Sequence, residues 1–311
     1  MKQSRPAKNA RRLLCLALSL LTAIAVTACA DNEEKTDSVP DEAASLTLTR
    51  EELPVIDGAL ALAPYYEAMT ARLLHVDVEE ARTLVLCSNT PSAYQNLTDG
   101  KADMIFCAMP SEEQVETARQ AGVTFEYHTI LNGGFVFFVN KENPVRSLTK
   151  KQLQDIYRGK IKNWKELGGD DVEIIPYQRN EGSGSQTGLY RFLLPKQAVM
   201  QAPTELAIGD MGEIVDAVAH YDNAKGAIGY SYYYYVSSMH YTDQIKLLGV
   251  EGVIPSDKTI SDGSYPMINH SQIVIRDDTP QDSVVRKIIA WCQSEEGAKL
   301  AEENGYVANR M

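Results

Sequence analysis

Residues 174–194, IIPYQRNEGSGSQTGLYRFLL, restrict the possible folds of this chain more than any other stretch does. The stretch opens with an apolar run that Pro176 closes, which is typical of the end of a buried strand. A polar loop with two glycines follows, and apolar residues then recur from Leu189 at the spacing of one helix face. Apolar runs alternate with helical patterns along the rest of the chain too, so we predict an α/β fold.

The polar loop has the composition of an anion-binding turn. The first N–H groups of a helix have no intrahelical partner, and the helix dipole adds partial positive charge there. Ser183 and Ser185 can cap the helix or donate a hydroxyl, and Arg179 offers a planar fork suited to oxyanions. The alternative is an ordinary turn with a capping serine, which is the commoner origin of such loops. No Gly-Lys-Ser/Thr follows at the required spacing, so the loop is not a P-loop.

Residues 1–28 have the pattern of a targeting segment. Five basic residues precede an apolar run of 16 residues, which is short for a membrane span. The run ends Val-Thr-Ala-Cys and resembles the lipobox of bacterial lipoproteins, which predicts cleavage before Cys29 and lipidation of its sulfur. A plain secretory signal or a short anchor helix are the alternatives. Residues 29–46 are acidic and polar, and we expect a disordered tether.

Charge and cysteine content exclude several classes of function. The formal charge is −12, and it becomes −17 without the five basic residues of the targeting segment. Such a charge argues against nucleic acid and against a basic membrane-binding face. We expect Cys87 and Cys107 to be buried small apolar residues, with a disulfide between them left open. The histidines are scattered and no catalytic triad is apparent, so we predict no metal, no cofactor and no enzymatic activity.

A resemblance to a known family adds to these inferences. Arg179-x-Glu181-Gly182-Ser183-Gly184-Ser185 resembles the binding loop of PstS-like phosphate-binding proteins, which deliver substrate to ATP-binding cassette importers. Residues 147–168, SLTKKQLQDIYRGKIKNWKELG, closely resemble another block of that family. Similar segments extend over about residues 50–308.

The resemblance implies a ligand set and also reveals departures from it. Glu181 would orient the neighbouring arginine, and Asp57 would lie behind the ligand residues. Leu60 stands where the family has a hydroxyl, and Met109-Pro110 stand where better-known members have an acid. The residues implied to contact the ligand are Ala59, Thr90, Ser111, Arg179, Ser183, Gly184 and Ser185.

The resemblance further implies the periplasmic-binding-protein type of α/β fold. Two lobes would each hold a mostly parallel sheet flanked by helices, with hinge strands between them and the ligand in the cleft. We expect one lobe at residues 47–135 plus 245–311 and the other at 136–244.

The expected function is that of a monomeric, lipid-anchored receptor on the extracytoplasmic face of the cell membrane. It would capture inorganic phosphate and deliver it to the permease and ATPase subunits of an importer. The alternatives are a binding module for another oxyanion or an organic phosphate, a non-transport sensor or surface protein, and, more weakly, an extracellular hydrolase.

Overall fold

The computed structural model describes residues 46–202, 206–221 and 224–310. The predicted targeting segment, the lipidation site at Cys29 and nearly all of the predicted tether lie outside these residues. Residues 41–311 form one compact unit. In the described part of the chain, no helix is long and apolar enough to cross a bilayer.

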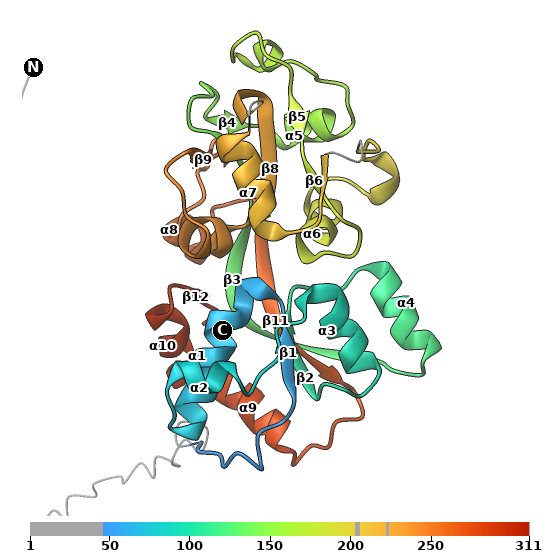
Figure 1. The fold of residues 1–311 in the computed structure, drawn as a ribbon, viewed down its shortest axis with the longest axis vertical. Coiled ribbons are helices and arrows are strands. Elements are labelled where there is room, and N and C mark those ends of the chain that lie inside the picture. The colour runs from blue at the N-terminus through green and yellow to red at the C-terminus, as the bar shows by residue number, and fades with distance from the viewer. Residues whose placement is uncertain (1–45, 203–205, 222–223, 311) are drawn as a thin grey trace, which may run out of the picture. The chain divides into compact units, whose positions relative to one another are not determined.

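One long strand, β3 (Phe125–Asn140), organises the main sheet (Figure 1). Its N-terminal half pairs antiparallel with β11 (Ile268–Arg276) and its C-terminal half with β8 (Ala227–Tyr232). Short strands β9 (Ile245–Leu247) and β12 (Val307–Ala308) also pair antiparallel with it. These pairings connect the two ends of the molecule through one strand.

Parallel pairs complete the sheet at each end. At one end β1 (Ile56–Gly58) pairs parallel with β2 (Met104–Cys107), which pairs antiparallel with β11. At the other end β5 (Ile175–Pro176) pairs parallel with β8. Two further parallel pairs lie apart from the main sheet: β4 (Ser147–Leu148) with β10 (Gly249–Val250), and β6 (Gln178–Arg179) with β7 (Ala207–Ile208). The sheet is therefore mixed, because the long strands that join its two ends run antiparallel.

Helices follow most of the strands, as the alternating pattern predicts. Thr149 and Ser111 act as N-caps with complete capping boxes, so the sequence fixes these two helix starts locally. The α-helices are α1 (Ala63–Leu74), α2 (Val78–Arg82), α3 (Asn89–Thr98), α4 (Glu112–Gln120), α5 (Lys150–Tyr157), α6 (Gly184–Phe192), α7 (Met211–His220), α8 (Asp257–Ser261), α9 (Val284–Cys292) and α10 (Glu295–Glu303). Short 3₁₀ segments include η1 (Leu60–Leu62), directly before α1, and η2 (Trp164–Leu167).

Buried apolar side chains divide between two lobes, as expected for this fold. Two clusters draw on residues 48–131 and 273–308, and a third draws mainly on residues 135–267. The third cluster includes Leu248, Val250 and Ile260, which the predicted boundary at residue 245 assigns to the other lobe. That boundary is too early, because β9 and β10 pair with β3 and β4 and so continue the second lobe. We place the return of the chain to the first lobe at β11.

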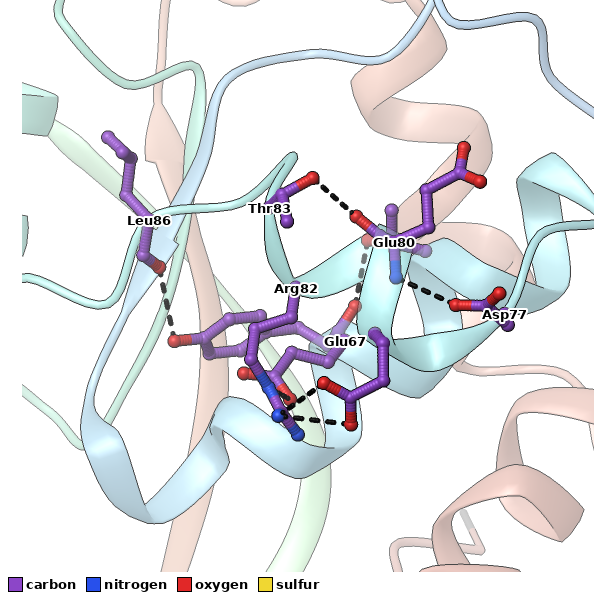
Figure 2. A network of polar contacts seen from close by, with 9 residues as sticks. Glu67, Asp77, Glu80, Arg82, Thr83 and Leu86 are labelled. Carbon is purple, nitrogen blue, oxygen red and sulfur yellow. Dashed lines mark hydrogen bonds and ion pairs between the residues drawn. The ribbon is translucent and has the colours of Figure 1, made fainter.

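The segment after α2 differs from its prediction. The sequence of residues 83–87, TLVLC, predicts a short strand, but these residues form a turn and an irregular stretch. Figure 2 shows what holds this region: Arg82 pairs with Glu67 of α1, and the Tyr66 hydroxyl donates to the carbonyl of Leu86. Cys87 is exposed and Cys107 is buried, and both are free thiols, so the expectation that both are buried is wrong for Cys87.

Trp164 is a structural residue. Its ring is 1% exposed, and its Nε1–H donates to the carbonyl of Gly226 at 2.9 Å. Gly226 lies so close to the strand beside it that a Cβ atom there would be 2.3 Å from the carbonyl oxygen of Glu173. Real Cβ atoms do not approach oxygen so closely, so only glycine fits without a shift of the backbone.

We therefore expect Gly226→Ala to lower the free energy of unfolding by roughly 1–3 kcal/mol, the usual effect of overpacking. Gly209→Ala is the matched control, because a Cβ there meets no heavy atom within 4 Å. Urea unfolding followed by circular dichroism would measure both. Equal losses of stability in the two variants would contradict the steric explanation.

Candidate functional site

Arg179 ends β6 and is 8% exposed. Its Nε donates to the carbonyl of Ile208 at 3.0 Å, one terminal nitrogen donates to Gly209 O at 2.9 Å, and the other lies 3.3 Å from the Ser185 hydroxyl. A guanidinium carries five N–H donors, so two remain for a ligand. Burial lowers the pKa of Arg179, while Tyr230 and Asp210 nearby oppose that shift.

The Gly-Ser loop opens helix α6 and is buried. Ser183 is the N-cap and accepts a hydrogen bond from the Gln186 N–H at 3.2 Å. Ser185 is fully buried, and Ser183 is 6% exposed. The Gly184 and Ser185 N–H groups stand in the first helical turn, where no intrahelical acceptor exists. The predicted loop therefore combines a guanidinium, a hydroxyl and two such N–H groups.

Helix α3 of the first lobe meets this loop end to end. Asn89 begins the helix with φ of 69°, and Thr90 follows with 6% exposure. A Cβ on Gly184 would be 2.9 Å from the Thr90 hydroxyl oxygen, so the two helix N-termini touch. Because Gly184 has no side chain, the backbone of the loop approaches Thr90 closely.

Asp57 holds the first-lobe side of the site together. Its carboxylate is fully buried and accepts from the N–H groups of Gly58 at 2.7 Å and Ser88 at 2.9 Å. It also accepts from the Asn96 side chain at 2.8 Å. Since Ser88 is the N-cap position of α3, these bonds fix where Thr90 lies. Asp57 therefore holds the start of α3 in place, and its position behind a bound ligand stays a prediction.

A small cavity of about 40 Å³ lies beside Thr90, while Arg179 and residues 183–185 do not line it. Ala59, Ala61 and Thr90 line it from the first lobe, and Met211 and Tyr232 from the second. The Ala59 N–H donates to the carbonyl of Phe106, whereas the next two N–H groups open a helix and lack intrahelical acceptors. About 10–15 Å³ of such volume holds one water, so the cavity suits a group of a few heavy atoms.

Two predicted site residues lie elsewhere. Ser111 uses its hydroxyl to cap α4, where it accepts from the Gln114 N–H, and it lines a separate groove. Glu181 pairs with Lys196 at 3.1 Å and accepts from the Tyr190 hydroxyl, so the prediction that it orients Arg179 is wrong. The carbonyls of residues 208 and 209 do so instead. Glu181 lies at the edge of the loop, and its carboxylate points away from Arg179 because it pairs with Lys196.

The sequence did not reveal two residues of the cavity wall. Tyr232 donates its hydroxyl to the Gly184 carbonyl at 2.7 Å. It opens the run of four tyrosines at residues 232–235, for which the sequence suggests a helix, but it is the last residue of β8. Asn269, on β11, lines the same cavity and is 7% exposed. Its only sequence signal was a polar residue beside a predicted strand.

Two lobes joined by long strands, with the N-termini of α3 and α6 in contact where the lobes meet, define a two-lobed binding protein. The chain belongs to the PBP superfamily, whose domain matches residues 55–296. This match covers most of the described residues and confirms the predicted fold class.

Comparison with individual proteins agrees with this assignment. The chain is 26% identical over 259 residues to a "Phosphate-binding protein PstS" of Staphylococcus epidermidis, covering 81% of this chain and 78% of the relative. It is 24% identical over 297 residues to a protein of the same name from Bacillus subtilis, covering 95% of this chain and 92% of the relative.

Solved structures with the same fold include a putative phosphate ABC transporter substrate-binding protein from Clostridium perfringens, with bound phosphate. Its TM-score is 0.65 at 24% identity, over 83% of this chain and 99% of that one. The structure of an ABC-type phosphate transport receptor from Vibrio cholerae has a TM-score of 0.62 at 23% identity, over 82% of this chain and 99% of that one. These likenesses establish the two-lobed architecture.

Removing the Asp57 carboxylate tests its structural part in the site. Asp57→Ala leaves one buried and two part-buried donors without their acceptor, so we expect a loss of about 1–3 kcal/mol in the free energy of unfolding. Asp99→Ala is the control, because Asp99 bonds to the side chains of Gln95 and Lys101 at the surface. Denaturant titration compares the two. A loss no larger for Asp57→Ala than for Asp99→Ala would refute this account.

Proposed function

We propose that this protein is a solute-binding receptor that captures inorganic phosphate for an ATP-binding cassette importer. The main structural support for this proposal is the contact between two helix N-termini, at Thr90 and Gly184, beside the buried Arg179. Helix N-termini bind oxyanions because their N–H groups point outward and their dipoles favour negative charge. The names of the PstS relatives support phosphate as the oxyanion.

In this proposal the ligand residues act from both lobes. Thr90 and the N–H groups that open η1 bind from the first lobe. Gly184, Ser185 and the two remaining donors of Arg179 bind from the second. Ser183 acts indirectly, since its hydroxyl already caps α6. A ligand that bonds to both lobes stabilises the closed arrangement by its differential affinity for that arrangement.

We further propose that the protein works outside the cell membrane, anchored by a lipid on Cys29, as a monomer and without catalysis. The lipobox-like run before Cys29 and the acidic segment after it support the anchor. Labelled palmitate incorporated into the natural chain but not into Cys29→Ala would agree with this. Equal labelling of both would contradict it.

The phosphate site is tested through Arg179. We expect Arg179→Ala to bind inorganic phosphate about 30-fold more weakly or worse, since losing a charge-assisted, desolvated pair costs on the order of 2–5 kcal/mol. Isothermal titration calorimetry measures the affinity, and circular dichroism confirms folding. Arg119→Ala is the control, because Arg119 pairs only with Glu116 on the exposed face of α4.

Unchanged phosphate affinity in folded Arg179→Ala would exclude this site. Binding of sulfate as tight as phosphate would instead favour a general oxyanion receptor. The absence of a carboxylate at Met109-Pro110 gives that second candidate its support, because a carboxylate would reject a fully deprotonated anion.

A further inference from the structure

A second, larger cavity lies beside the first and shares three wall residues with it. Its volume is about 240 Å³. Ala108, Tyr232 and Asn269 line both cavities. This annex is also lined by Thr187 and Arg191 of α6 and by His270 and Gln272 of β11. A ligand held in the first cavity therefore has space beyond it in one direction, between α6 and β11.

Asn269 stands on the wall common to both cavities with an unused acceptor. Its side-chain oxygen Oδ1 is buried and has no hydrogen-bond partner among the described residues. The residue is 7% exposed, and Gly133 leaves room for it, since a Cβ at Gly133 would be 2.8 Å from that oxygen. A buried acceptor left unpaired destabilises the folded protein, because it has lost its bonds to water. A donor brought by a ligand would remove that cost.

Arg191 provides charge at the other side of the annex. One terminal nitrogen lies 3.4 Å from the carbonyl oxygen of Pro110, and no carboxylate pairs with this guanidinium within the described parts of the chain. No aspartate or glutamate lines either cavity. In a chain of net charge −12, an arginine without a carboxylate partner beside a cavity is available to an anionic ligand.

We propose that the annex receives the organic part of a small phosphomonoester that carries a carboxylate. The phosphate binds where Thr90, on the wall of the first cavity, meets the N-terminus of α6. The carboxylate pairs with Arg191, and a ligand hydroxyl donates to Asn269. This inference rests on the proposed function and extends it from inorganic phosphate to a class of organic phosphates. The annex is smaller than the ~300–1,000 Å³ of sites for drug-sized ligands, which favours a small organic part.

Calorimetry on the purified full chain separates the possibilities. The probes are inorganic phosphate, glycerol 3-phosphate, 3-phosphoglycerate and glycerate. We expect 3-phosphoglycerate to bind at least tenfold more tightly than glycerol 3-phosphate, and glycerate not to bind. Arg191→Gln should lower the ratio of 3-phosphoglycerate to inorganic phosphate affinity about tenfold, and Arg191→Lys should restore part of it. Arg119→Gln, outside both cavities, should leave that ratio unchanged.

Three results would overturn the proposal. Binding of inorganic phosphate without either ester rejects the annex as a ligand site and leaves the proposed function standing. Binding of neither phosphate nor ester rejects both. An unaltered affinity ratio in folded Arg191→Gln rejects the pairing of the carboxylate with Arg191.

Discussion

The hydrogen bonding of strand β3 is the constraint on which the rest of the molecule depends. Its sixteen residues pair with β8, β9, β11 and β12, and both lobes build their cores on it. Because side chains alternate along a strand, a shift of one residue in the pairing of β3 would exchange its inward and outward side chains in both lobes at once. The place of every site residue relative to the opposite lobe follows from this one strand and its partner β11 (Figure 1).

Sequence reasoning found the features whose causes are local. The strand, loop and helix around Arg179 depend on residues within a few positions of each other. It failed where the partner is distant. Glu181 turns to Lys196 and Tyr190, and the segment before Ser88 leaves the sheet because Asp57 and Tyr66 hold it by other bonds. Asn269 could not be foreseen, because its role comes from two cavities that only the folded chain creates.

The candidate site concentrates favourable potential for an anion inside an acidic chain. Its positive contributions are short-ranged: partial charges of helix N-termini and the guanidinium of Arg179. Carboxylates at the surface are largely screened beyond about 10 Å in ordinary salt. Asp57, the acid closest to the first-lobe loops, has its charge offset by three N–H donors. The net charge of the chain and the affinity of the site for an anion are therefore set by different residues.

The contact of Gly184 with Thr90 also has a mechanical consequence. The two helix tips come together only because one of them presents bare backbone. Any larger residue at position 184 would clash with Thr90 and hold the two lobes further apart, whatever ligand was present. The glycine that exposes backbone N–H groups thus also determines how closely the two lobes can approach each other.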